Sequence, residues 1–289
     1  MQIDSSSKIL EIEKLLGEKT KRLQSVTGGD ISDAYLLSTD KENYFLKINE
    51  SALATALFEA EAKGLQLIGQ HCHCPEVIHH GPFQNSPGAF LILPYIQSGN
   101  KDKQFWVSLG QSLAQLHRVS ATQFGLAHDN FIGRLPQSNN HHDNWAAFYA
   151  QQRLFPQVKM AFDNKMLSKE DTRSFDRLYS KLNNLCPSEK SALIHGDLWS
   201  GNFMVNKNQL PVFIDPSVSY SHREMDLAMS LLFGGFDPQF YHSYIGSYPL
   251  EPGFEARVAL YQLYYLLVHV NLFGGSYVNG VKQALSKYI

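Results

Sequence analysis

Three side chains between residues 197 and 215 have the types and the spacing that phosphoryl transfer requires. Asp197 and Asn202 share the run His195-Gly-Asp-Leu-Trp-Ser-Gly-Asn, and Asp215 follows in Ile-Asp-Pro. The reaction needs one carboxylate to orient and deprotonate an attacking hydroxyl, and oxygen ligands for Mg²⁺ ions that neutralise the transferring phosphate. An Asp and an Asn on one loop, with a second Asp at the end of the next hairpin, bring these groups together. The spacing therefore indicates a phosphoryl-transfer site.

A glycine-containing turn near the N-terminus is the first of three further parts that such a site needs. It comprises Gly28, Gly29, Asp30, Ile31 and Ser32, and it lies between two predicted strands. Backbone N–H groups of a tight turn can lie over a triphosphate. Taken alone, a Gly-Gly turn is more often an ordinary hairpin. Because a carboxylate is unfavourable beside phosphates, we expect Asp30 to point away from them or to bond within its turn.

A lysine and a glutamate form the second part. Lys47 ends the strand that contains Phe45 and Leu46, where it suits a cation that pairs with the α- and β-phosphates. Glu61 lies in the following helix and could pair with Lys47. Glu59 is a rival partner half a turn away, and the sequence leaves this choice open.

The third part is a hinge after the last strand of the first hundred residues. Pro94, Tyr95 and Ile96 lie where a hinge would meet adenine. Pro94 has no N–H, so it could offer only its carbonyl, and the donor would be Ile96 or Tyr95. Each part is a weak signal alone. Together, in this order and on elements of these types, they predict a kinase-like nucleotide site.

The hydrophobic pattern of the first hundred residues predicts the elements that hold these parts. Helical spacing covers residues 8–16 and 52–69, alternation between 23 and 49 indicates a meander of strands, and a further strand covers 89–94. Strands, a helix and a strand make a small α+β lobe. The polar segment 97–103 is typical of a linker.

The rest of the chain has a mainly helical pattern. Strand candidates at 191–195 and 203–214 flank the reactive segment, and the second folds about a turn at 206–208. We therefore expect an ATP-binding lobe over residues 1–96 and a larger lobe over residues 97–289, with the catalytic loop and the substrate-binding helices. The predicted helices of the larger lobe are 105–119, 145–153, 169–185, 224–234, 237–247, 254–273 and 277–288.

Composition narrows the class of protein. The chain has 289 residues and a formal net charge of −2, which argues against a nucleic-acid partner because such binding needs clustered Lys and Arg. Three cysteines favour a reducing compartment. No signal peptide is visible, and the most apolar stretch, residues 260–273, is too short to span a bilayer. We expect a cytoplasmic protein with no membrane partner, and a buried helix at 260–273.

Longer segments carry a resemblance to a known family. The run Asp-Leu-Trp-Ser-Gly-Asn at 197–202, with Arg-Glu-Met-Asp-Leu-Ala-Met at 223–229 and Leu-Phe-Gly-Gly-Phe at 232–236, resembles the fructosamine kinase family (ketosamine-3-kinases). This family is related to aminoglycoside and choline kinases, and the resemblance covers nearly the whole chain from about residue 23. The matching segments are 58–68, 124–139, 143–157, 193–205, 213–236 and 260–277.

The resemblance implies a two-lobed, protein-kinase-like fold of the α+β class and ATP-dependent phosphorylation of the 3-hydroxyl of a ketosamine. Such a substrate is a sugar attached to an amine, free or on a protein lysine, and the phosphorylated adduct decomposes to free the amine, which is a deglycation repair. By position, Asp197 would be the catalytic base, and Asn202 and Asp215 would hold Mg²⁺. Lys47 and Glu61 would position the phosphates of ATP.

Other residues of the matching segments would take supporting roles. Trp199 lies beside the base, where it could pack against the sugar or be buried as a loop anchor. Asp226 would brace the catalytic loop through hydrogen bonds, with His195 as further structural support. Arg223 could pair with Glu224, with Asp226 or with a substrate group. The sequence does not determine the oligomeric state, and we expect a monomer.

Two other functions fit parts of the pattern. An aminoglycoside or small-alcohol kinase would need acidic walls for a polycation, but residues 227–289 hold only three acidic side chains. A nucleotide-binding pseudokinase is disfavoured because Lys47, Asp197, Asn202 and Asp215 are all present. Separately, the tract His71-Cys-His-Cys74 invites zinc binding, but it lacks the paired spacing of zinc sites, and we do not expect a metal there.

Overall fold

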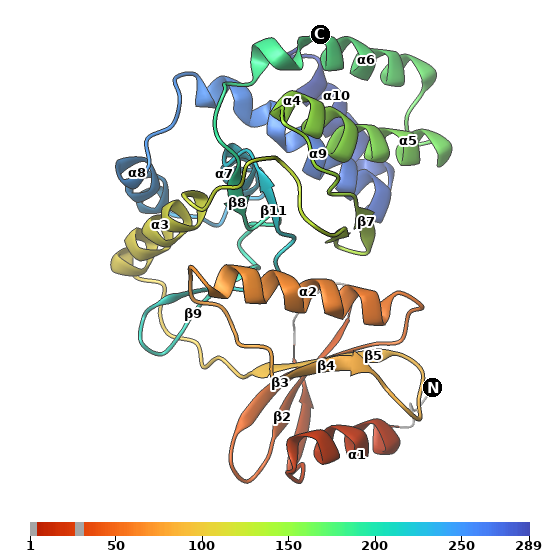
Figure 1. Ribbon diagram of the computed structural model, residues 1–289, viewed down its shortest axis with the longest axis vertical. Helices are drawn as coiled ribbons and strands as arrows, with labels where there is room; N and C mark the ends of the chain where they lie inside the picture. Colours follow the sequence, from red (N-terminus) through yellow and green to blue (C-terminus); the bar gives the residue numbers. More distant parts are fainter. Residues whose placement is uncertain (1–4, 27–31) are drawn as a thin grey trace.

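The computed structural model describes residues 5–26 and 32–289, and Figure 1 shows a sheet-containing part below a larger helical part. The first part is a five-stranded antiparallel sheet of order β1-β2-β3-β5-β4. Its strands are β1 (Arg22–Ser25), β2 (Asp33–Ser38), β3 (Asn43–Asn49), β4 (His79–Pro82) and β5 (Ala89–Pro94).

Two helices cover the two faces of this sheet. Helix α1 (Ser5–Leu16) packs on the face that carries Leu46 and Ile48, and α2 (Ala54–Gly69) packs on the other face. Because side chains alternate along a strand, Lys47 lies on the face that α2 covers. Figure 1 shows α2 between the sheet and the helical part. The alternation of β3 thus turns one lysine toward the rest of the molecule.

The helical part packs around α9 (Phe254–Phe273), which has buried side chains on all sides. The prediction of a helix at 260–273 is confirmed, and the helix is largely buried up to Val270, whereas Phe273 at its end is exposed. Among the described residues, no helix is both long enough and apolar enough to cross a membrane. The other helices are α3 (Lys103–His117), α4 (Trp145–Phe148), α5 (Phe155–Asp163), α6 (Lys169–Leu185), α7 (Glu224–Leu232), α8 (Pro238–Ser247) and α10 (Val278–Leu285).

Three short antiparallel strand pairs lie among these helices. Two of them frame the reactive segment, and the third forms a hairpin near α9. The pairs are β8 (Ala192–Ile194) with β11 (Ser219–Ser221), β9 (Phe203–Val205) with β10 (Pro211–Phe213), and β6 (Asn130–Ile132) with β7 (Leu135–Gln137).

Several elements differ from the sequence prediction. The helix predicted at 145–153 continues through a π-helical turn at Tyr149–Leu154 into α5. Pro156 does not stop it, and the turn directly before this proline is the π-helical one, where the helix departs from the α pattern. Strand β4 lies in a segment for which the sequence predicted no helix or strand, and β6, β7 and β11 are too short for alternation to mark them.

The segment 97–103 is held against the β9–β10 hairpin. Ser98 forms a β-bridge with Asn206, and the N–H of Gly99 donates to the carbonyl of Val205 at 3.0 Å. Asp102 then caps α3, because its side chain accepts from the N–H at the third helical position. These contacts fix where the chain passes from the sheet to the helices.

Candidate active site

The turn that carries Asp197 begins directly after β8. Gly196 has a φ angle of +85°, and a Cβ at this position would overlap the carbonyl oxygen of Ser217. Only glycine both adopts this φ angle readily and leaves room for the oxygen of Ser217. The main chain can therefore pass close to Ser217 and place Asp197 on the cavity described below.

Asp226, the predicted brace, holds this turn from a fully buried position in α7. Its two carboxylate oxygens accept the backbone N–H groups of His195 at 2.7 Å and Gly196 at 2.8 Å. Nε2 of His117 lies 3.1 Å from Asp226, and Nδ1 lies 2.8 Å from the hydroxyl of Tyr244. Because an ionised carboxylate only accepts, Nε2 of His117 is the donor. The sequence did not predict a role for His117, because its spacing there is that of any other residue in an amphipathic helix.

His195 links the turn that carries Asp197 to the strand end that precedes Asp215. Its Nε2 lies 2.9 Å from the carbonyl oxygen of Ile214, and its Nδ1 accepts the N–H of Asp197 at 3.3 Å. Burial lowers the pKa of His195, so the ring is neutral with its proton on Nε2. The side chain thus ties two segments together, as the predicted supporting role requires.

Asp197 and Asn202 lie together on one loop. The amide nitrogen of Asn202 donates to the carbonyl oxygen of Asp197 at 2.8 Å and to its carboxylate at 3.0 Å. Burial raises the pKa of Asp197 to about 7, and the nearby Asp215 carboxylate adds to the rise. The carboxyl group can therefore exchange a proton near neutral pH.

Lys47 resolves the choice between Glu61 and Glu59. Its ammonium lies 2.8 and 2.9 Å from the two carboxylate oxygens of Glu61, and 2.8 Å from Asp215. Glu59 instead bonds the exposed Lys63 at 2.7 Å. Glu59 is therefore not the partner of Lys47. Through its bonds to Glu61 and Asp215, Lys47 joins α2 to the segment that carries Asp215.

This ion cluster carries excess negative charge. Burial alone would lower the pKa of Lys47, but the carboxylates of Asp215 and Glu61 outweigh it and raise that pKa. Burial raises the pKa of Glu61, whereas Lys47 holds the pKa of Asp215 low. Asp215 also has a φ angle of +52°, a conformation that is uncommon outside glycine and that recurs at functional sites.

A cavity of about 630 Å³ opens beside these groups, a volume typical of ligand sites. We call five of its lining residues the central polar group: Lys47, Glu61, Asp197, Asn202 and Asp215. Carboxylate and amide oxygens are the donors that Mg²⁺ prefers, so Asn202 and Asp215 fit this ion in chemistry and in charge.

Trp199 also lines the cavity. Its side chain is 37% exposed, and its ring covers Gly201, where a Cβ would overlap the indole. The alternative of a buried loop anchor is therefore wrong. The exposed part of this side chain is available to a ligand in the cavity.

The predicted nucleotide turn is only partly described. Gly28, Gly29, Asp30 and Ile31 lie outside the described residues. Ser32 lines the cavity, as predicted for a residue near the phosphates, and its hydroxyl accepts from the amide of Asn49 at 3.2 Å.

The hinge prediction needs one correction. The N–H of Tyr95 donates to the carbonyl of Asn43 at 3.0 Å, because the pairing of β3 with β5 continues one residue past Pro94. Tyr95 therefore cannot supply the adenine donor, and Ile96 is the remaining candidate. Pro94, Tyr95 and Ile96 do not contribute to the described lining of the cavity.

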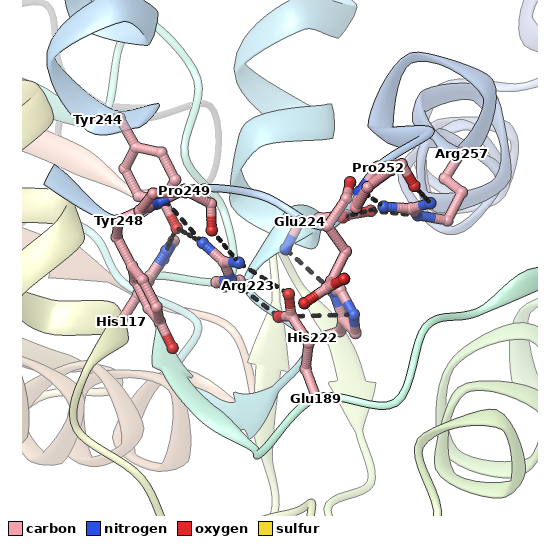
Figure 2. Close-up of polar contacts among 11 residues, drawn as sticks. His117, Glu189, His222, Arg223, Glu224, Tyr244, Tyr248, Pro249, Pro252 and Arg257 are labelled. Atoms are coloured by element: carbon pink, nitrogen blue, oxygen red, sulfur yellow. Dashed lines mark hydrogen bonds and ion pairs between the residues drawn. The ribbon is translucent and has the colours of Figure 1, made fainter. Parts of the chain in front are cut away.

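Arg223 is bonded to neither acidic residue of α7. It pairs through Nη2 and Nε with Glu189 at 2.7 and 2.8 Å, while Arg257 pairs with Glu224 at 2.6 and 2.9 Å (Figure 2). Glu189, His222 and Glu224 are close enough to surround a metal ion. Each glutamate is already neutralised by an arginine, however, so an ion would add uncompensated positive charge.

The cysteine tract has a packing role. The thiol of Cys72 donates to the carbonyl of Ser112 at 3.2 Å, and that of Cys74 to Leu65 at 3.0 Å. Burial raises the pKa of Cys72 to about 12 and that of Cys74 to about 11. Both side chains are therefore thiols at neutral pH, whereas zinc binds thiolates.

The central polar group is assembled from both parts of the molecule. Lys47 and Glu61 come from the sheet and its helix, whereas Asp197, Asn202 and Asp215 come from the segment after β8. A sheet whose lysine pairs with a helical glutamate, joined to a helical part that carries the acidic residues, is the protein-kinase-like fold. The protein is a phosphotransferase of this fold class.

Comparisons with known proteins name the family. A sequence model described as "Fructosamine kinase" matches residues 4–289, so the chain belongs to the fructosamine kinase family. The "Probable ketoamine kinase" of Lactiplantibacillus plantarum is 40% identical over 93% of this chain and 94% of its own length. The "Protein-ribulosamine 3-kinase, chloroplastic" of Arabidopsis thaliana is 34% identical over 93% of this chain and 82% of its own length.

Solved structures agree with this assignment. A crystal structure described as a fructosamine-3-kinase from Thermobifida fusca has a TM-score of 0.86 and 30% identity, covering 97% of each chain. A ternary complex of aminoglycoside phosphotransferase APH(4)-Ia with ADP and hygromycin B has a TM-score of 0.62 and 15% identity, covering 97% of this chain and 96% of that one. The second likeness shows a shared fold alone.

Proposed function

We propose that the protein transfers the γ-phosphoryl group of ATP to the 3-hydroxyl of a ketosamine. The observation that carries the proposal is the carboxylate of Asp197, which lines a ligand-sized cavity and has a pKa of about 7. Such a group can accept the hydroxyl proton as the new P–O bond forms. The names of the relatives, a ketoamine kinase and a ribulosamine 3-kinase, support the substrate class and the position.

The nucleotide would bind along the side of the cavity formed by the sheet. Lys47, oriented by Glu61, would exchange its bond to Asp215 for the α- and β-phosphates. The backbone of residues 28–32 would lie over the triphosphate. The carbonyl of Pro94 and the N–H of Ile96 would bind adenine.

Asn202 and Asp215 would hold Mg²⁺. When bound, the ion would neutralise charge on the phosphates and orient them for transfer. The chain's own contribution is the loop geometry: Asn202 is held by two bonds to Asp197, so the base and a metal ligand keep one relative position. Support for this assignment comes from the excess negative charge of the ion cluster.

The sugar would lie against Trp199, whose exposed ring suits the C–H face of a sugar. This contact would present the 3-hydroxyl to Asp197. His195 and Asp226 would keep the carboxylate in place through the backbone of the turn. We also place the reaction in the cytoplasm, because the three cysteines are free thiols.

The test measures ADP formation with a panel of acceptors: fructosamines, ribulosamines and erythrulosamines, free and on a protein, with kanamycin and choline as controls. We expect turnover with ketosamines only, dependent on Mg²⁺, and a phosphate on carbon 3 in the NMR spectrum of the product. Turnover with kanamycin or choline alone would replace the proposal by another alcohol kinase. No turnover with any acceptor, despite ATP binding, would replace it by a pseudokinase.

A further inference from the structure

Part of the cavity has a chemistry that phosphoryl transfer does not use. Four side chains form an aromatic wall: Phe233, which directly follows α7, His269 and Phe273 of α9, and Tyr277 of the following 3₁₀ turn. The His269 ring centroid lies 4.7 Å from Phe233, 5.4 Å from Phe273 and 5.0 Å from Tyr277. About half of the surface of Phe233 and Phe273 is exposed. The wall can therefore receive the apolar surface of a ligand.

Arg134 adds a positive charge to this wall. It is the second residue of the two-residue turn between β6 and β7, and its Nη2 donates to the carbonyl of Leu272, in the last turn of α9, at 3.0 Å. Apart from Lys47, it is the only lysine or arginine among the described residues that line the cavity. A guanidinium has five N–H donors, and Leu272 accepts from one nitrogen only.

Buried hydrogen bonds set the position of this turn. The amide of Asn130 donates to the carbonyl of Val218 at 2.8 Å and accepts from Gln137 at 2.8 Å. The hydroxyl of Tyr264, in α9, donates to Gln137 at 2.5 Å. The hairpin is thus tied both to α9 and to the segment after Asp215, so the turn that carries Arg134 is positioned before any substrate arrives.

We propose that Arg134 makes this protein select ketosamines that carry an anionic group away from the reacting hydroxyl. The inference rests on the function proposed above. A planar guanidinium binds a carboxylate or a phosphate through two parallel hydrogen bonds, and it repels cations. A free amino acid adduct supplies the carboxylate, and a sugar phosphate adduct supplies the phosphate. A lysine adduct within a cationic protein surface supplies neither.

A purely structural role for Arg134 makes different predictions. A cation near the last carbonyls of α9 stabilises the helix end. If this were its whole contribution, substitution would lower the melting temperature and affect every substrate alike. Selection of anions instead changes the ratio of kcat/KM between matched substrates.

The experiment compares fructosyl-glycine with its uncharged amide, and a ribulosamine with its 5-phosphate. We expect the wild type to prefer at least one anionic member by about tenfold in kcat/KM, which is about 1.4 kcal/mol. The preference should fall at high salt, because the site is exposed. Arg134→Gln should remove it by lowering kcat/KM for the anionic members more than for their uncharged partners, Arg134→Lys should retain part of it, and the exposed Arg173→Gln should leave it intact.

The two substrate pairs show which part of the substrate carries the anionic group that the protein selects. Preference within the glycine pair alone assigns the anion to the amine side, and preference within the ribulosamine pair alone assigns it to the sugar. Equal kcat/KM within both pairs, or an equal effect of Arg134→Gln on all four substrates, would overturn the inference and leave the kinase assignment standing. If the wild type phosphorylates none of the four, the proposed function itself has failed.

Discussion

Two clusters of ion pairs in this molecule differ in charge balance. In the first, Lys47 bonds two carboxylates, Glu61 and Asp215, and Asp197 lies nearby on the same cavity. The cluster thus has one positive group, Lys47, and two carboxylates, or three when Asp197 is counted. The carboxylates are partly open to the cavity, so a cation or a charged ligand can reach them.

The second cluster is balanced. Arg223 pairs with Glu189, and Arg257 pairs with Glu224, each through two hydrogen bonds (Figure 2). The remaining guanidinium donors bind backbone carbonyls of the segment before α9. The carbonyls are those of Tyr248, Pro249, Glu251 and Pro252.

The comparison separates two uses of buried charge. A cluster whose charges cancel and whose guanidinium nitrogens all donate hydrogen bonds fastens loops and helix ends to one another. A cluster with excess charge on a cavity wall stores an unfavourable interaction that a ligand of opposite charge can relieve. Charge balance, rather than the number of ion pairs, distinguishes the structural cluster from the candidate active site.

The largest expected effect is at Asp197. Asp197→Asn should lower kcat for ketosamine phosphorylation roughly a thousandfold, because the amide cannot accept the hydroxyl proton. ATP affinity, measured by calorimetry, should stay nearly unchanged, since Lys47 and Asp215 remain. The exposed Asp176→Asn on α6 is the matched control and should behave as wild type. Unchanged turnover in Asp197→Asn would exclude this carboxylate as the base.

The same substitution in each cluster should have opposite consequences. Glu224→Gln leaves Arg257 without its charged partner, so the free energy of unfolding in urea should fall by about 3 kcal/mol. Glu61→Gln removes excess negative charge, so that free energy should change by less than about 1 kcal/mol. Activity should show the reverse order, with kcat/KM about a hundredfold lower in Glu61→Gln because Lys47 is no longer oriented.

A combined variant checks this contrast. Glu224→Gln with Arg257→Met removes both charges of one pair and should recover part of the lost stability. A similar loss of stability in both single variants would mean that the two clusters do not differ in the way proposed. Intact kcat/KM in Glu61→Gln would remove Glu61 from the nucleotide site.

The pH dependence is the smallest effect. Asp197 must be ionised to act as a base, and its pKa is raised to about 7. kcat/KM at limiting substrate and nucleotide should therefore fall about tenfold per pH unit below 7 and level off above it. A profile that stays flat down to pH 5 would show that burial and Asp215 do not raise this pKa in solution. Asp176→Asn should reproduce the wild-type profile.

Much of the site could be predicted from the sequence because its parts are local. The loop from Asp197 to Asn202 is six residues long, so its own geometry brings the two side chains together. Lys47 was predicted from its place at the end of a strand. Alternation also marked the sheet, and helical spacing marked α2, α6 and α9 with boundaries close to those observed.

Contacts between distant segments could not be predicted in the same way. His117 bonds Asp226 over 109 residues of sequence, and Arg223 bonds Glu189 rather than the acidic residues beside it. Tyr95 loses its free N–H because the strand pairing extends one residue further than its sequence pattern. In each case several partners have the right chemistry, and only the packing of helices and strands selects one.

The sequence by itself predicted the chemistry: the proposed base, the two proposed metal ligands and a lysine with a glutamate partner, each from residue type and short-range spacing. The tertiary structure decided which glutamate meets Lys47, that Trp199 is open to the cavity, and that Arg134 lies on its aromatic wall. The physical reason is that backbone periodicity acts over a few residues. The position of one element against another depends on the side chains of the whole interior, where the lowest free energy is chosen among many pairings that are locally acceptable.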